Sequence, residues 1–170
     1  MALGKLKSIS TDLTSANIAV ILERLAQSSE RLDVLFRSVH AETLRQPMAA
    51  GERTPTEVLA HLLNGEARSA EMIYQALLTD EPYFADLHPD RDYGKLLRFD
   101  QLGFAELLTY FNIRRKVLLR VLSGLTEAQW GRTIQEEGKK RRESVYWRAR
   151  TIVMHELDHL GDLEDKLWRK

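Results

Sequence analysis

The sequence contains no cysteine among its 170 residues. This absence excludes disulfide bonds, cysteine-ligated zinc and a cysteine nucleophile, so any sulfur chemistry must use a thiol brought in from outside. It is also compatible with the reducing environment of a cytoplasm.

The chain also lacks an excess of charge of either sign. Lys+Arg and Asp+Glu both number 25, so the formal net charge is zero. Nucleic-acid-binding proteins normally carry a basic excess or a basic stripe, and none is evident. No apolar run approaches the length of a membrane span, and Met1 to Ser10 lack the apolar core of a signal peptide. We therefore expect a cytoplasmic protein with neither nucleic acid nor membrane as a partner.

No stretch alternates convincingly like a strand, whereas four stretches repeat apolar residues at helical spacing. We expect helices at about residues 16–39, 54–78, 99–122 and 144–168. Thr54, Pro55 and Glu57 match a capping box with proline at the first helical position. One extra helical turn is expected at Thr126 to Trp130, and the charged run from Glu136 to Glu143 is expected to be a solvated loop.

Residues 80–98 contain two prolines and a glycine, which predicts a long connection between the second and third helices, with room for a short helical piece. The length of 170 residues fits one domain. Together these features predict an all-α fold: a single four-helix bundle over residues 1–170, with a long crossover between helices 2 and 3.

The fourth helix carries His155-Glu156-Leu157-Asp158-His159, an HExxH pattern. Histidines four residues apart lie one above the other on the same face of a helix, and imidazole is a good ligand for Zn, Ni, Cu and Fe(II). Two ligands do not make a site, so a third must come from elsewhere in the chain.

His61 is the best candidate for the third ligand. On a helical wheel it falls at the edge of the apolar face of the second helix, just as His155 and His159 fall at the edge of the fourth. Gly65 lies one turn beyond His61 and leaves space beside an imidazole. His40 and His88 are in or beside loops and are expected to be solvated.

Three imidazoles would leave a coordination position free, as in catalytic rather than structural zinc sites. A water bound there would have its pKa lowered, or a thiol could bind as thiolate. The alternative is that the three histidines are unrelated residues at helix edges.

The chain resembles the DinB-like superfamily of metal-binding four-helix bundles. The resemblance rests on TPTEVLAHLLNGE around His61, on RKVLLRVL beginning at Arg115, and on HELDHLGD beginning at His155. It implies one divalent metal, Zn or Ni, on His61, His155 and His159, and it implies a homodimer. Characterised relatives include thiol S-transferases and the mycothiol-dependent maleylpyruvate isomerase. Two departures affect inference about substrates: Arg53 stands where the family often has Trp, and Asp162 where it often has Gln.

Four charged residues could support such a site. Glu156 lies near the centre of an apolar face. It could act there as a general base or form a buried salt bridge to an arginine. Arg115, on the core stripe of the third helix, could clamp a substrate carboxylate or pair with Glu66 or Glu156. Glu66 could also fix the free ring nitrogen of His61. Asp162 could be a fourth ligand, orient a metal-bound water or be solvated.

The favoured function is a metal-dependent thiol S-transferase that acts on a small molecule, with a low-molecular-weight thiol as a candidate cofactor. A metal-dependent hydrolase and a non-catalytic, stress-related metal-binding bundle are the alternatives. HExxH also suggests a metallopeptidase, but only 11 residues follow His159, too few for another ligand helix.

Overall fold

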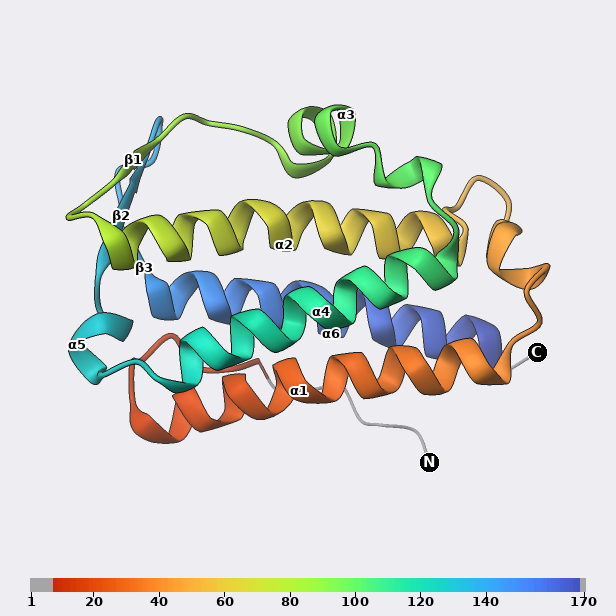
Figure 1. Ribbon diagram of the computed structural model, residues 1–170, viewed down its shortest axis with the longest axis horizontal. Coiled ribbons are helices and arrows are strands. Elements are labelled where there is room, and N and C mark those ends of the chain that lie inside the picture. The colour runs from red at the N-terminus through yellow and green to blue at the C-terminus, as the bar shows by residue number, and fades with distance from the viewer. Residues whose placement is uncertain (1–7, 169–170) are drawn as a thin grey trace.

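Four long helices dominate the computed structural model, which describes residues 8–168. They are α1 (Ser15–Ser38), α2 (Pro55–Leu78), α4 (Phe104–Ser123) and α6 (Val145–Trp168), and they lie side by side as a bundle (Figure 1). Their starts follow from local chemistry: Thr54 and Glu57 form the expected capping box, and the Thr14 side chain accepts from the backbone N–H of Asn17. The predicted four-helix bundle is therefore confirmed.

The third long helix begins five residues later than its apolar pattern suggested. Gly103 precedes it, and the Glu106 side chain accepts from the Gly103 backbone N–H at 2.9 Å, which fixes the start at Phe104. The residues before it form a separate 3₁₀ turn, η3 (Phe99–Gln101). The expected extra turn after α4 is present as α5 (Glu127–Trp130), which Thr126 caps.

The core of the bundle is divided by a polar layer half-way along the helices. Each long helix contributes leucine, isoleucine or phenylalanine side chains to two buried clusters, one towards each end. Between the clusters, buried polar residues from all four helices form one hydrogen-bonded group around Arg115: Ser28, Glu66, Arg115 and Glu156. The histidines of the predicted metal site lie at this same level of the bundle, because His61 and Glu66, and likewise His155 and Glu156, are close in sequence.

A small three-stranded sheet closes one end of the bundle, where α2 ends and α6 begins (Figure 1). Its strands are β1 (Tyr83–Phe84), β2 (Thr133–Glu136) and β3 (Glu143–Ser144), with β1 parallel and β3 antiparallel to β2. The sequence pattern did not indicate these three short strands, and the expectation of a solvated loop at 136–143 was wrong at both of its ends. Glu136 and Glu143 are buried, and both pair with arginines of the bundle.

The long crossover between α2 and α4 is present and runs along the outside of α2 (Figure 1). After β1 it forms a π-helical turn, η2 (Pro89–Tyr93), and a short helix, α3 (Gly94–Leu97). A further 3₁₀ turn, η1 (Thr43–Arg45), lies in the connection from α1 to α2. Within residues 8–168, no helix is both long and apolar enough to cross a membrane.

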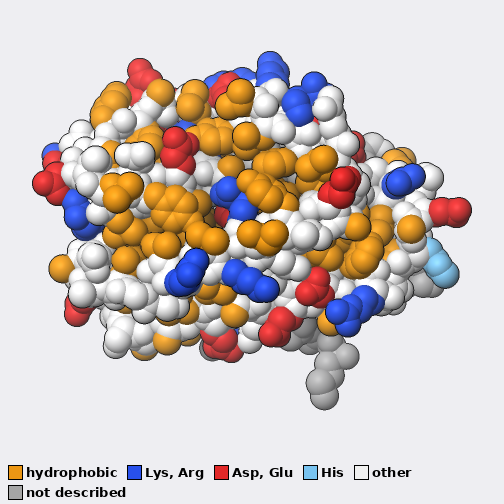
Figure 2. All heavy atoms as spheres, viewed as in Figure 1, with side chains coloured by type: hydrophobic (Ala, Val, Ile, Leu, Met, Phe, Trp, Pro, Cys, Tyr) orange, Lys and Arg blue, Asp and Glu red, His pale blue; other side chains and the backbone are white. Residues whose placement is uncertain are grey.

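The face shown in Figure 2 carries hydrophobic side chains interspersed with charged ones over α2, α4 and α1. On α4 the exposed apolar side chains are Tyr110, Ile113 and Val117. Single exposed apolar residues are ordinary on protein surfaces, so this face by itself assigns no partner.

Candidate metal centre

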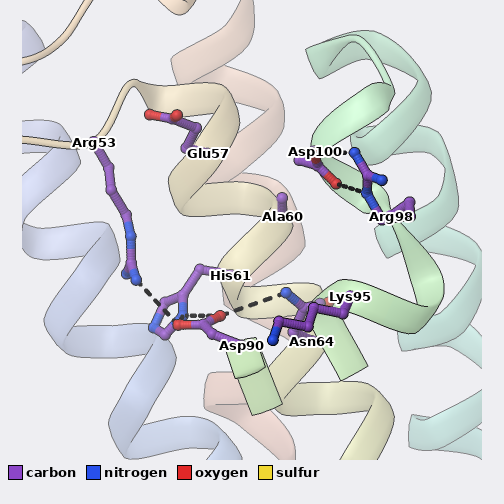
Figure 3. Close-up of a pocket in the computed structure, with 10 residues that line it drawn as sticks. Arg53, Glu57, Ala60, His61, Asn64, Asp90, Lys95, Arg98 and Asp100 are labelled. Atoms are coloured by element: carbon purple, nitrogen blue, oxygen red, sulfur yellow. Dashed lines mark hydrogen bonds and ion pairs between the residues drawn. The ribbon is translucent and has the colours of Figure 1, made fainter. Parts of the chain in front are cut away.

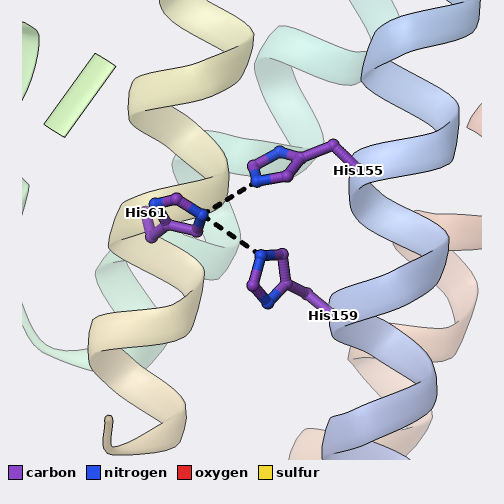
Figure 4. A group of neighbouring side chains, drawn as sticks. All are labelled: His61, His155 and His159. Carbon is purple, nitrogen blue, oxygen red and sulfur yellow. Dashed lines mark hydrogen bonds between the residues drawn. The ribbon is translucent and has the colours of Figure 1, made fainter. Parts of the chain in front are cut away.

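His61, His155 and His159 converge at the middle of the bundle (Figure 4). The Nε2 atom of His61 lies 2.8 Å from Nε2 of His155 and 3.1 Å from Nε2 of His159. The three ring centroids are 4.7–4.8 Å apart, and each pair of rings is close to perpendicular. The predicted meeting of histidines from the second and fourth helices is confirmed.

Helix geometry explains this arrangement. His155 and His159 are one turn apart on α6, so their rings project from the same face towards α2. Gly65 gives one of these rings its space: a Cβ atom at Gly65 would lie 3.3 Å from both Cε1 and Nδ1 of His155. The glycine was expected to make room beside His61, but its close neighbour is His155 on the opposite helix.

Asp90, in the crossover turn η2, fixes the orientation of His61. Both carboxylate oxygens of Asp90 lie 2.8 Å from Nδ1 of His61. A carboxylate can only accept, so Nδ1 carries the proton and Nε2 presents a lone pair to the other two rings. Sequence reasoning assigned this supporting role to Glu66 and missed Asp90, because no motif links a crossover aspartate to a histidine 29 residues earlier.

Further side chains hold Asp90 in place (Figure 3). Arg53 pairs with its Oδ2 at 3.0 Å, and the Asn64 side chain lies 3.4 Å from its Oδ1. Burial by itself raises the pKa of the Asp90 carboxyl, but the hydrogen bond and charge of His61 outweigh it, with help from Asn64 and Arg53, and lower that pKa. Asp90 is therefore an anion, as required to hold the Nδ1 proton of His61.

The donor set fits a divalent metal. Burial, followed by the nearby His61 and His159 rings, lowers the pKa of His155 to about 4, and burial lowers the pKa of His159 as well. Neutral imidazoles with converging lone pairs are what a cation requires. Ligands about 2.0–2.1 Å from one zinc ion stand roughly 3 Å from each other, which agrees with the 2.8 and 3.1 Å between the Nε2 atoms.

Two cavities meet at His61. The first, about 440 Å³, lies on the Asp90 side and includes Arg53, Asn64 and Lys95 in its lining (Figure 3). The second, about 480 Å³, is lined by both His61 and His155 and runs between α2 and α6 beneath the crossover. Because the second cavity reaches two of the three rings, it is the better candidate for a substrate site.

A model of the DinB superfamily matches residues 13–163, most of the chain. The chain belongs to the DinB superfamily. Among solved structures, the chain is similar to YfiT from Bacillus subtilis, described as a probable metal-dependent hydrolase with an unusual four-helix bundle topology. The TM-score is 0.80 at 15% identity, over 94% of this chain and 91% of YfiT, which shows a shared fold. No curated protein matched the sequence.

In this DinB-superfamily bundle, Arg115 and Glu156 form part of the buried polar layer. Arg115, with 1% of its side chain exposed, pairs with Glu156 and, at 2.7 Å, with Glu66, and it also donates to Ser28 at 2.7 Å. The structure thus favours ion pairing over a substrate clamp, since no substrate reaches a guanidinium enclosed in this way. Glu66 is likewise paired with Arg114 and Arg115, and His61 is held by Asp90 instead.

Glu156 lines the second cavity, but Arg115 binds both of its oxygens. Burial raises the pKa of Glu156, and the charge and hydrogen bonds of Arg115 only partly offset this effect. Asp162 is exposed and lies outside the three-histidine group, although its charge acts on His159. The exposed position of Asp162 favours a solvated side chain over a fourth metal ligand.

Proposed function

We propose that this protein is a metal-dependent hydrolase of a small molecule, with a divalent ion held by His61, His155 and His159. The observation that carries the proposal is the convergence of the Nε2 atoms of three histidines, two of which, His61 and His155, line a 480 Å³ cavity. When bound, such an ion would supply Lewis-acid activation of a water molecule or of a substrate oxygen. The description of YfiT as a probable metal-dependent hydrolase supports the same class.

The chain's own residues would prepare the site in three ways. Asp90 holds the Nδ1 proton of His61 and keeps the lone pair of Nε2 directed at the other rings. The missing side chain at Gly65 lets the His155 ring lie against α2. Leu62 and Ile152 give the cavity apolar walls, which exclude water from a bound substrate.

The number of ligands favours catalysis over a purely structural ion. Structural zinc sites are usually closed by four protein ligands, whereas catalytic sites have three and leave a position for water or substrate. Among residues 8–168, the group of potential ligands contains only three members. Zn and Ni are our candidate ions, because neutral imidazole suits both.

The test is metal content together with hydrolysis. Protein loaded with zinc or nickel is assayed by elemental analysis and against a panel of nitrophenyl esters and amides, beside the variants His61→Ala, His155→Ala and His159→Ala. His40→Ala is the matched control, because His40 is an exposed histidine that lines neither cavity. We expect one ion per chain and metal-dependent turnover, both lost in the three variants and kept in the control. Full metal retention by His61→Ala would disprove the site.

The role of Glu156 is tested by Glu156→Gln. Because Arg115 binds both oxygens of Glu156, we expect loss of stability rather than loss of a proton-accepting group. Unfolding at lower urea concentration with kcat retained in the folded protein would support the structural role. A large fall in kcat with unchanged stability would restore the general-base role.

Thiol S-transfer is the alternative activity, and it rests on the family resemblance. An external thiol would occupy the same cavity, since the chain has no cysteine of its own. Metal-dependent consumption of a low-molecular-weight thiol, without hydrolysis of any ester or amide, would favour it. A small-molecule substrate, a homodimer and a cytoplasmic location stay predictions of the sequence.

A further inference from the structure

The second cavity is a trough with the metal-site histidines at one end and two arginines at the other. His61 and Arg68 are seven residues apart on α2, and Arg148 and His155 are seven apart on α6. The two helices run in opposite directions (Figure 1), so both separations extend the same way along the trough. Seven residues of helix span about 10 Å, which sets the distance between the two ends.

The arginine end is a buried ionic cluster that ties β2 and β3 to the bundle. Arg68 pairs with Glu136, and Arg148 lies 2.5 Å from both Glu136 and Glu143. Lys139 reaches Glu136 at 2.7 Å and Glu143 at 3.1 Å, while 43% of its side chain stays exposed. The two arginines are buried, with 4% and 7% exposure, yet both line the cavity.

This cluster contains more positive charge and more donors than its carboxylates use. Three cations face two carboxylates, which leaves one positive charge in excess. Each guanidinium has five N–H donors, and Nε of Arg148 is buried without a hydrogen-bond partner among residues 8–168. On the crossover side, Asp86 and Arg91 also line the trough and contribute one charge of each sign.

Between its two ends the trough is mostly apolar. Its lining there includes Leu62 of α2, Ile152 of α6 and Leu87 of the crossover, together with the polar side chain of Thr151. Glu66 and Glu156 also reach the lining, but Arg115 pairs with both of them and Arg114 pairs with Glu66. A ligand that matches the trough from end to end has a reactive group at the histidines, a short apolar middle and a terminal anion at the arginines.

We propose that the trough selects substrates with a terminal carboxylate or phosphate about 10 Å from the bond that reacts, the distance set by two helical turns. Arg148 and Lys139 receive the anion, and Arg68 supports them through Glu136. The inference rests on the proposed hydrolase, whose substrate class it specifies. The competing explanation is that the cluster serves only to anchor the β2–β3 hairpin.

Direct binding tests the anion site independently of turnover. Calorimetry on the zinc-loaded protein compares linear dicarboxylates from succinate to sebacate with their monomethyl esters, and ω-phosphorylated acids form a second series. We expect the free anion to bind roughly tenfold to a hundredfold more tightly than the ester, the range for charge-assisted hydrogen bonds. The preference should peak at one chain length, and the two series identify the preferred anion. Equal binding of acid and ester would overturn the proposal.

Lys139→Gln is the decisive variant, with Lys140→Gln as its control. Both lysines are exposed neighbours in the same turn, but only Lys139 lines the trough, so Lys139→Gln remains informative even if Arg148→Gln fails to fold. We expect Lys139→Gln to lose most of the preference for the anion and Lys140→Gln to keep it. Identical behaviour of the two variants would leave the cluster only its anchoring role.

The two proposals can fail separately. If no ester is hydrolysed but the anion preference depends on Lys139, the trough is a binding site and the hydrolase proposal fails alone. If esters are hydrolysed without regard to a terminal anion, the hydrolase proposal stands and the proposed specificity is wrong.

Discussion

Asp90 has the most specific effect on the metal site of any residue outside the three histidines. Both of its oxygens lie within hydrogen-bond distance of the Nδ1–H group of His61, and Asp90 is itself held by Arg53 and Asn64. A carboxylate behind a ligand histidine fixes the ring and increases its basicity. The candidate site therefore depends on the crossover, although all three histidines lie on the long helices.

Replacing Asp90 with Asn should weaken metal binding without removing it. The amide keeps the shape but loses the charge, so we expect the metal affinity to fall by roughly 10–100-fold. Competition with a chromophoric chelator measures this change. Asp100→Asn is the control, because Asp100 lines the same cavity but pairs with Arg98. Equal losses in the two variants would show that Asp90 acts only through the overall charge.

Gly65 and Gly161 both lie in long helices, so replacing each with alanine separates the effect of side-chain packing from that of backbone entropy. A Cβ at Gly65 would lie 3.3 Å from two ring atoms of His155, whereas a Cβ at Gly161 on α6 would meet nothing within 4 Å. Gly161→Ala should stabilise the protein by about 1 kcal/mol, the difference in helix propensity, and leave metal affinity unchanged. Gly65→Ala should show little or none of this gain and a weaker metal affinity, because the His155 ring must move. Urea unfolding and chelator competition measure the two effects, and stabilisation of Gly65→Ala with normal metal affinity would contradict the argument.

At the scale of elements, the ionic cluster between β2, β3 and α6 gives the fold a dependence on acid pH. Burial alone raises the pKa of Glu136, but hydrogen bonds from Lys139 and Arg68 and the charge of Arg148 outweigh this effect and lower it to about 2. A carboxyl group with a lowered pKa in the folded state favours folding above its unfolded pKa of about 4.3. This stabilisation is then lost as pH falls towards the folded-state value.

We therefore expect the free energy of unfolding to decrease between about pH 4.5 and pH 2, with Glu136 a major contributor. Glu136→Gln should be less stable at neutral pH and should show a shallower decrease across this window. Urea unfolding at a series of pH values measures both effects, with the exposed neighbour Glu137→Gln as the control. Parallel pH profiles for the wild type and Glu136→Gln would contradict the assignment.

The long helices could be predicted because each combines a sustained apolar repeat with a local start signal. Thr54, Pro55 and Glu57 fixed the start of α2 to the residue, and both histidine faces followed from the helical period. The strands were missed because the longest has four residues, too few for an alternating pattern to be distinguished from a turn. The residues of β1 also pair with residues of β2 that lie 52 positions later in the sequence, as Tyr83 does with Gln135.

Charged residues on apolar faces were recognised as unusual, but their partners could not be chosen from sequence. Arg115 was expected either to hold a substrate or to pair with Glu66 or Glu156, and it pairs with both. The helical period predicts which face of its helix a residue occupies, but it does not predict how neighbouring helices are rotated or shifted relative to one another. The contact between Asp90 and His61 could not be predicted from sequence either, because it depends on the path of the crossover.

At the scale of the whole molecule, metal binding should be coupled to folding. The three ligands come from α2 and α6, which lie on either side of the trough, so an ion held by all three binds the folded state far better than the unfolded chain. A ligand at a hundred times its Kd stabilises the folded state by about 2.7 kcal/mol. For a chain of this length each kcal/mol raises Tm by roughly 2–4 °C.

Zinc in that excess should therefore raise Tm by roughly 5–10 °C over chelator-treated protein, as measured by calorimetry. The double variant His155→Ala/His159→Ala should show no such increase, because it keeps a single ligand. His40→Ala should respond like the wild type, since His40 is an exposed histidine outside the cluster. An equal increase in the double variant would place the stabilising ion elsewhere on the protein. A wild-type Tm that zinc does not change would mean that the three rings, despite their geometry, do not hold the metal tightly enough to bind α2 to α6.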